Sequence, residues 1–187
     1  MNANKVMALM LIVVPGLLVG CATAPTSKAD QEALVAEGTS SLQQMRAEDP
    51  GLGELVRRSY GYAIFPEVTK GGLGVGGAYG RGVVYEQGRQ VGYSDLSHAS
   101  LGLQAGGQTF SELLLFENKD ALERFKAGQF NFGADASAVV MESGAATNVH
   151  FVDGVAVVVR PTGGAMVEAA VGGLAGWGTD LQRAADL

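Results

Sequence analysis

Glycine is concentrated in a part of the chain that otherwise has the composition of β-strands. The sequence holds 28 glycines in 187 residues, and seven of them lie between residues 71 and 82. Glycine inside a strand usually marks a bulge, a sharp bend or a close approach of two backbones. Hydrophobic residues still make up 47% of the chain, so this is not the composition of a disordered protein. We therefore expect a strongly curved β-sheet.

The region before these glycines has a helical pattern. Ser27 followed by Asp30 resembles an N-terminal capping arrangement. Apolar or small residues then recur at helical spacing until Pro50-Gly51 interrupts them. Further along, Asn118 can cap another helix. The predicted helices span residues 28–48, 52–59 and 119–127.

The rest of the chain predicts strands joined by tight turns. Glu86-Gln87-Gly88-Arg89 and Asp153-Gly154 are hairpin signals between apolar runs. Pro66 is expected to end the first strand, and residues 134–141 fit a helix or a strand equally well. The predicted class is α+β, with N-terminal helices, then a glycine-rich, strongly curved antiparallel β-sheet (barrel-like or a sandwich), and one further helix. The predicted strands are 60–65, 73–85, 90–94, one or two within 100–116, 148–152, 155–160 and 165–171.

The amino terminus has the layout of a secretory signal. Lys5 gives it a weakly positive start, and residues 6–19 are almost all apolar. The run is shorter than the ~20 residues that a membrane span needs. Leu18-Val19-Gly20-Cys21 resembles a bacterial lipobox, in which the cysteine becomes the first mature residue and carries lipid on its sulfur and amino group. The alternatives are an ordinary signal with an incidental cysteine, or a membrane anchor. Ala22, rather than Asp, after the cysteine favours the outer membrane.

Charge and cysteine content narrow the possible partners. The formal net charge is −6, which argues against nucleic acid and against a broad basic face on anionic lipid. Cys21 is the single cysteine, so no disulfide can form within the chain. The stability of the fold must therefore come from packing.

The sequence carries no convincing catalytic, metal or cofactor site. Gly72-x-Gly74-x-x-Gly77 matches a dinucleotide pattern but is followed by a strand-like segment rather than a helix. Residues 102–109 resemble a phosphate loop with its lysine replaced by Gln108. Asp95, Ser97 and His98 lack a nucleophile elbow. We therefore expect a protein that is not an enzyme and needs no cofactor. Four glutamates without a visible pairing rule are expected to be solvated: Glu112, Glu117, Glu142 and Glu168.

Two basic residues stand beside glycines and are candidate ligand contacts. Lys70 precedes Gly71-Gly72, and Arg81 lies between Gly80 and Gly82. Glycine neighbours let backbone N–H groups approach an anion. A nearby cation could then complete a pocket for an anionic headgroup. The alternative is an ordinary pair of solvated surface charges. Lys70 and Arg81 are thus the predicted lipid-headgroup contacts.

Six segments, in order along the chain, carry a family resemblance: Tyr60-Gly-Tyr-Ala-Ile-Phe-Pro66, Lys70-Gly-Gly-Leu-Gly-Val-Gly-Gly-Ala-Tyr-Gly80, Gln104-Ala-Gly-Gly-Gln-Thr-Phe-Ser-Glu112, Phe125-Lys-Ala-Gly128, Gly154-Val-Ala-Val-Val158 and Met166-Val-Glu-Ala-Ala-Val-Gly-Gly173. They resemble the SYLF-domain family over roughly residues 34–177, which implies a lipid-binding module. Eukaryotic members bind phosphoinositides and some regulate actin, whereas bacterial members are commonly envelope lipoproteins. The lipobox pattern predicts residues 1–20 as lipoprotein signal peptide and 21–27 as lipidated linker, and the resemblance implies 28–187 as SYLF-like domain.

Two functional hypotheses follow from these features. The first is a protein anchored by acyl chains at Cys21 in the bacterial envelope, on the outer membrane facing the periplasm, that binds phospholipid or another amphiphile through its glycine-rich sheet. The second is a structural or assembly protein of the outer membrane, not an enzyme and without a ligand of its own. Lipid affinity of the purified domain separates the two.

Overall fold

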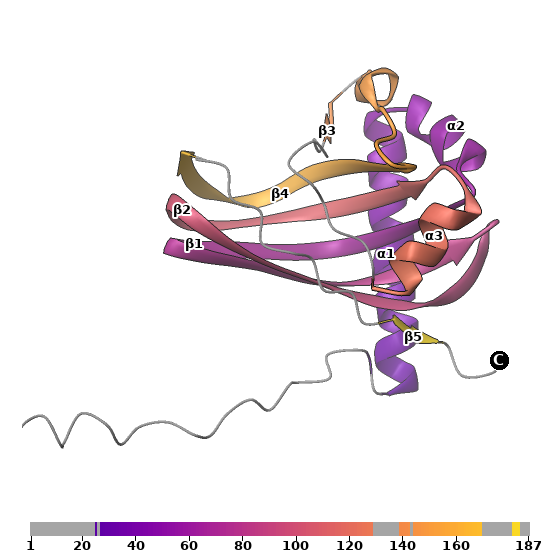
Figure 1. Ribbon diagram of the computed structural model, residues 1–187, viewed down its shortest axis with the longest axis horizontal. Helices are drawn as coiled ribbons and strands as arrows, with labels where there is room; N and C mark the ends of the chain where they lie inside the picture. Colours follow the sequence, from indigo (N-terminus) through magenta and orange to yellow (C-terminus); the bar gives the residue numbers. More distant parts are fainter. Residues whose placement is uncertain (1–24, 26, 129–138, 143, 170–180, 184–187) are drawn as a thin grey trace, which may run out of the picture.

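The computed structural model describes residues 25, 27–128, 139–142, 144–169 and 181–183 (Figure 1). Cys21 and the ambiguous residues 134–138 lie outside this described part. The predicted α+β class is confirmed, because two helices precede a sheet and a further helix interrupts it. In chain order the elements are α1 (Lys28–Glu48), α2 (Gly51–Arg58), β1 (Gly61–Glu86), β2 (Arg89–Phe116), α3 (Lys119–Lys126), β3 (Val139–Val140), the 3₁₀ helix η2 (Ala145–Asn148), β4 (Val155–Ala169) and β5 (Leu181–Arg183).

One long hairpin makes up most of the sheet. β1 pairs antiparallel with β2 from Gly61↔Phe116 to Glu86↔Arg89. The two-residue turn between them has φ of +49° at Gln87 and +78° at Gly88, a pair of positive values that suits the right-handed twist of a hairpin. The turn predicted here from the sequence is confirmed, as is the one at Asp153-Gly154, where φ is +50° and +79°.

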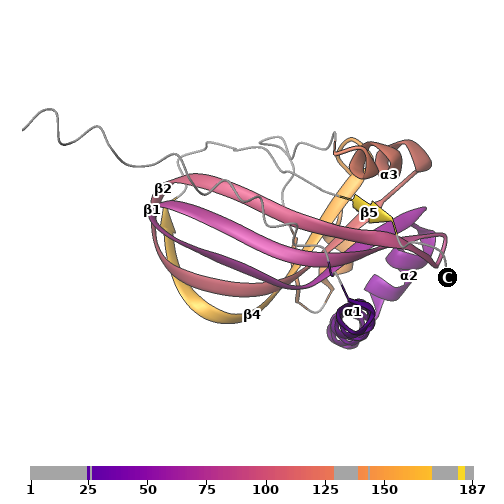
Figure 2. The same ribbon diagram turned by 90° about the horizontal axis from the view of Figure 1, so that it is seen from below.

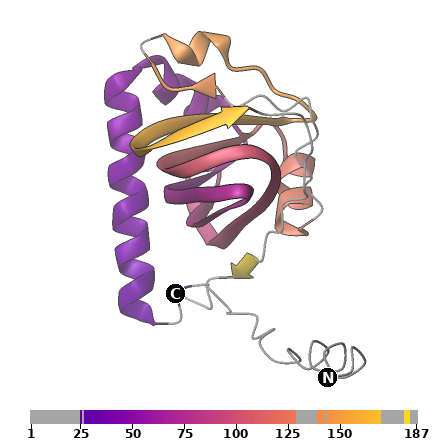
Figure 3. The same ribbon diagram turned by 90° about the vertical axis from the view of Figure 1, so that its left-hand side faces the viewer.

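The hairpin folds back on itself at its glycine-rich middle. Figure 3 looks onto this bend, where β1 forms an inner U and β2 a wider U around it. The two arms of β1 then touch, and glycine makes the contact possible. A Cβ atom on Gly82 would lie 2.6 Å from the ring of Phe65, and one on Gly80 would lie 2.9 Å from the backbone oxygen of Glu67. The expectation that strand glycines serve bends and close backbone approach is borne out at these positions.

The sheet differs from the predictions in several respects. The segments predicted at 60–65 and 73–85 form the single strand β1, those at 90–94 and within 100–116 form β2, and the strand predicted at 148–152 is reduced to an isolated bridge at Val152. Pro66 does not end the first strand, because β1 continues past it through a bulge between Phe65 and Val68. The sheet is mixed rather than antiparallel throughout, since β3 pairs parallel with β4. The strand order is β1-β2-β4-β3, with β5 on β2. Within the described residues the sheet is curved but open, so the barrel-like form is not confirmed.

The predicted helices all form, with caps that explain their starts. The Ser27 side chain accepts a hydrogen bond from the backbone N–H of Asp30 at 3.1 Å, and α1 covers the predicted residues 28–48. Asn118 accepts from the N–H of Ala121 at 3.0 Å and so begins α3. Figure 2 shows α1 end-on against one side of the hairpin, with α3 on the other side.

Two apolar clusters hold these layers together. Alternate side chains of a strand point to opposite faces, so Ile64 and Val83 pack under α1 and α2, whereas Phe65 and Val84 pack toward α3. Gly38, which has no side chain, lets α1 pack closely against both arms of β1. A Cβ there would lie 3.2 Å from Ile64 Cγ2 and 3.8 Å from Val83 Cγ2.

A buried carboxylate fixes the corner between α1 and α2. Asp49 is 4% exposed. Its Oδ1 accepts from the N–H of Gly51 at 2.8 Å, and its Oδ2 accepts from the N–H of Ala146 at 2.7 Å. Hydrogen bonds to a charged acceptor are among the stronger ones in proteins. The end of α1, the start of α2 and η2 are therefore tied to one side chain.

Candidate functional site: a cleft between the first helix and the folded hairpin

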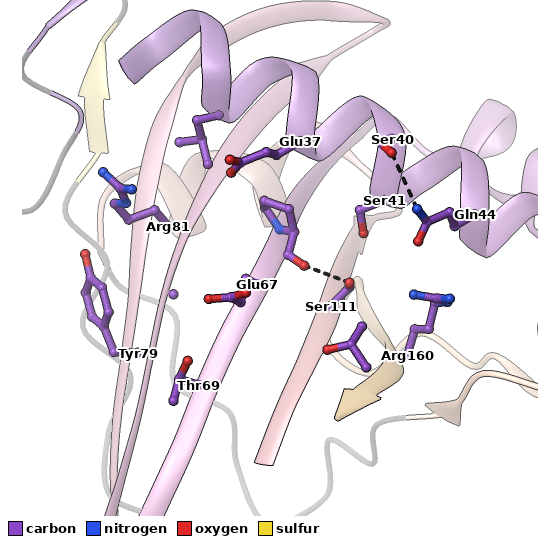
Figure 4. A pocket seen from close by; sticks show the side chains of 14 residues that line it. Glu37, Ser40, Ser41, Gln44, Glu67, Thr69, Tyr79, Arg81, Ser111 and Arg160 are labelled. Atoms are coloured by element: carbon purple, nitrogen blue, oxygen red, sulfur yellow. Dashed lines mark hydrogen bonds between the residues drawn. The ribbon is translucent and has the colours of Figure 1, made fainter. Parts of the chain in front are cut away.

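A cleft of about 650 Å³ lies between α1 and the sheet. Figure 4 shows side chains of α1 on one wall and side chains of β1, β2 and β4 on the other. The wall is mostly polar, with apolar contributions from Leu34 and Pro66. The lining residues are Leu34, Glu37, Ser40, Ser41 and Gln44 of α1, Pro66, Glu67, Thr69, Tyr79, Gly80 and Arg81 of β1, Ser111 of β2, and Arg160 and Thr162 of β4.

The bulge in β1 shapes the floor of the cleft. Phe65 pairs with Glu112 and Val68 with Phe110, which leaves Pro66 and Glu67 opposite the single residue Ser111. Proline lacks an N–H and is tolerated in sheets at such irregular positions. The carbonyl of Pro66 instead accepts a hydrogen bond from Ser111 Oγ at 2.8 Å. The bulge thus turns polar backbone and a hydroxyl toward the cleft.

Ser41 is an unusual member of the wall. It is 6% exposed, and its buried Oγ has no hydrogen-bond partner among the described residues. Buried polar groups are nearly always paired, and an unpaired one costs ~1–3 kcal/mol. Ser41 is among the residues that line the cleft.

Charges of both signs surround the cleft. Glu37 and Glu67 contribute carboxylates, and Arg81 and Arg160 contribute guanidinium groups (Figure 4). Arg160 Nε donates to Glu48 Oε1 at 2.6 Å, so its charge is already paired. Arg81 is exposed and has no ion-pair partner among the described residues. It is the cation best placed to meet an incoming anionic group.

The two predicted headgroup contacts do not meet in this cleft. Arg81 lines it, but Lys70 does not. The neighbouring Thr69 does line it, and adjacent strand residues face opposite sides of a sheet. The Lys70 side chain therefore lies on the opposite face of the sheet. In the pairing of β1 with β2, Lys70 is opposite Gln108. Arg81 and Lys70 both remain predictions as ligand contacts.

Glu112 corrects one expectation from the sequence. The sequence predicts a solvated side chain, but Glu112 is 2% exposed, and its Oε1 has no hydrogen-bond partner in the part of the chain that the structure describes. Burial raises the pKa of the Glu112 carboxyl to about 8. Glu117 and Glu142 are exposed, as predicted. The signal that could have identified Glu112 is the alternation with Phe110, Leu114 and Phe116, which places it on an apolar face.

Other kinds of site receive no support within the described ranges. Among those residues, no group of three or more His, Cys, Asp or Glu side chains could hold a metal ion. None of the helices in the same part of the chain is both long enough and apolar enough to cross a membrane. The polar and apolar residues that line the cleft beside α1 make it the candidate site for a polar or amphiphilic ligand.

Comparison with known proteins gives one result that bears on this site. A search of curated proteins finds no match. Residues 97–175 match the family model Ysc84, described as "Las17-binding protein actin regulator". This segment contains most of β2, with Ser111, and all of β4, with Arg160 and Thr162, so it supplies part of the wall that faces α1. The resemblance seen in the sequence is thereby confirmed over residues 97–175, which match the Ysc84 (SYLF) family model.

Proposed function

We propose that the chain is a lipid-anchored protein of the bacterial envelope whose SYLF domain binds a phospholipid or another amphiphile in the cleft between α1 and the hairpin. The observation that carries the proposal is the buried, unpartnered hydroxyl of Ser41 in the wall of that cleft. Leu34 and Pro66 offer apolar surface close to it, and Arg81 offers a cation at the mouth. An amphiphile needs this combination of apolar surface and convergent polar groups.

Ligand binding is tested on the chain without residues 1–21, which leaves every described element intact. Native mass spectrometry should detect retained amphiphile, and the protein should float with phospholipid vesicles. Arg81→Ala should weaken binding about fivefold, the equivalent of ~1 kcal/mol for a charge contact at an exposed site. Lys70 does not line the cleft, so Lys70→Ala tests separately whether the headgroup also reaches the opposite face of the sheet. Arg89→Ala is the matched control, because Arg89 is exposed and does not line the cleft.

Ser41→Ala separates a ligand role from a structural one. The substitution removes an unpaired hydroxyl, so the free protein should be as stable as the wild type or slightly more stable. Affinity for the amphiphile should nevertheless fall. Absence of lipid from both assays, together with a stoichiometric protein partner in crosslinking, would instead favour the structural or assembly role.

Membrane attachment is assigned to acyl chains on Cys21. Two or more chains give stable anchoring, since each buried methylene contributes ~0.8 kcal/mol. Cys21→Ser should therefore move the protein out of the outer-membrane fraction, and the mass of the wild-type product should include the acyl groups. Unchanged fractionation of Cys21→Ser, with no acyl mass on the wild type, would refute the anchor.

A further inference from the structure

Three arginines line a second cleft at the other end of α1. Arg46 lies in the last turn of α1, and Arg57 and Arg58 lie in the last turn of α2. They share a cavity of about 1040 Å³ with Tyr60 and Tyr62. We call this cavity the arginine cleft. The chain as a whole is acidic, with a net charge of −6 and only 13 lysines and arginines. A cavity lined by three arginines is therefore opposite in sign to the protein as a whole.

Most of this positive charge is not neutralised by neighbouring carboxylates. The acidic residues of the arginine cleft are Glu54 and Glu117. Glu54 is ion-paired with Arg57. Arg46 and Arg58 make no ion pair with any described residue. Two free guanidinium groups therefore face one remaining carboxylate.

Arg46 and Tyr62 both line the arginine cleft, and both also line a smaller neighbouring hollow with Tyr85. Burial, with a smaller contribution from Tyr85, raises the pKa of Tyr62, and the Arg46 guanidinium opposes that rise. The charge of Arg46 therefore lies close to the Tyr62 phenol. Tyr62 is itself held in place by stacking on Tyr85, with ring centroids 4.7 Å apart.

The helix dipole does not account for the whole arrangement. A cation in the last turn of a helix is favourable by ~0.3–1 kcal/mol, and this explains each arginine by itself. It does not explain why the arginines of two helices line the same cavity. The corner fixed by Asp49, through Gly51 and Ala146, sets how α2 follows α1. The arginines are thus presented by a rigid corner, and a site fixed in advance loses less entropy when a ligand binds.

We propose that the arginine cleft binds a phosphate group, at a site separate from the cleft between α1 and the hairpin. Guanidinium groups match phosphate oxygens with paired hydrogen bonds, and lysine cannot reproduce this geometry. Tyr62 lines the same cavity and carries a hydroxyl donor, whereas the Tyr60 hydroxyl already donates to Glu86 Oε1 at 2.8 Å. The phosphate comes either from a phosphorylated solute, as a monoester, or from a phospholipid headgroup, as a diester.

Calorimetric titration of the full chain in detergent micelles tests the proposal with two soluble probes. Inorganic phosphate represents the solute, and glycerophosphoglycerol represents a headgroup without its acyl chains. Arg46→Gln/Arg58→Gln should weaken binding at least about tenfold, since a hydrogen bond to a charged group contributes ~1.5–3 kcal/mol. Arg46→Lys/Arg58→Lys keeps the charge but loses the paired hydrogen-bond geometry. The affinity of this variant should therefore be intermediate between that of the wild type and that of the double glutamine variant. Arg89→Gln should bind as the wild type does.

The outcomes separate the two sources and the two clefts. Binding of inorganic phosphate alone supports a solute, and competition by glycerophosphoglycerol supports a headgroup. Arg81→Ala should leave phosphate binding unchanged. The double glutamine variant should still retain amphiphile in native mass spectrometry. The two proposed sites are therefore tested independently of each other. The proposal is overturned if neither probe binds, or if the double glutamine variant binds both as tightly as the wild type. Arg46 and Arg58 are exposed, and circular dichroism checks that their replacement leaves the fold intact.

Discussion

Replacement of Glu112 by glutamine should stabilise the protein strongly at pH 8 and hardly at all at pH 5. The carboxyl has a pKa of about 8 in the folded protein, against 4.5 in the unfolded chain. Between these values the folded protein holds a proton that the unfolded chain has released. Stability of the wild type should therefore fall as pH rises from 4.5 to about 8 and change no further above that value.

The magnitude follows from the width of that interval. At ~1.36 kcal/mol per pH unit, the cost of burying Glu112 is roughly 3 kcal/mol at pH 7 and roughly 4 kcal/mol at pH 8, where the folded carboxyl is half ionised. Glutamine has the same shape and no charge to bury, so its stability should lack this pH dependence. The measurement is the free energy of unfolding in urea at pH 5, 6, 7 and 8 for both proteins, compared as a difference so that all other titrations cancel.

The control for this experiment is Glu142→Gln, which removes the same charge from an exposed position. Its difference from the wild type should be small and constant across the pH range. A Glu112→Gln difference that also stays constant with pH would show that the wild-type carboxylate is already ionised and solvated, contrary to its position in the sheet.

The second large effect is expected from adding one methyl group to Gly82. A Cβ there would lie 2.6 and 2.7 Å from two ring atoms of Phe65, and 2.8 Å from the backbone oxygen of Ile64. The Phe65 ring is completely buried, and a backbone oxygen cannot rotate away. The two arms of β1 must therefore separate, at a cost of about 3 kcal/mol or more. The urea midpoint should fall correspondingly, or the protein should fail to accumulate.

Gly53→Ala is the matched control for this glycine. It is the same chemical change inside α2, where a Cβ would meet nothing within 4 Å. Alanine is favoured over glycine inside a helix by up to ~1 kcal/mol, so this variant should be slightly more stable than the wild type. If Gly82→Ala were equally well tolerated, the arms of β1 could not be in contact.

The local elements could be predicted from the sequence because their signals are local. Ser27 and Asn118 cap helices by contacts within three residues, and Gln87-Gly88 adopts its turn through its own backbone preferences. The fold-back of β1 could not be predicted in the same way. It depends on Gly80 and Gly82 meeting residues of the opposite arm, and no local pattern encodes that contact. The same long-range packing lets β1 continue through Pro66, where the sequence suggested an end.

The candidate site was predictable only in part. Arg81 stands out in the sequence because glycines flank it, and it does line the cleft beside α1. Ser41 and Ser111 have no distinguishing neighbours and come together only through the packing of α1 on the hairpin. The arginines of the second cleft are separated along the chain by the turn after α1, so their shared cavity depends on the angle between the two helices.

The nested shape of the hairpin also constrains the order in which the protein can assemble. Glu86 and Arg89 are close in sequence and can pair as soon as the turn between them forms. Gly61 pairs with Phe116, which is distant in sequence, so this end of the hairpin can form only later. β4 pairs with β2 between Leu103 and Phe116, so it depends on that part of β2 for its pairing. Topologies dominated by such distant pairings fold slowly. A chain made from its amino terminus onward therefore leaves the Gly61 end of β1 without its partner strand until residue 116 has been made.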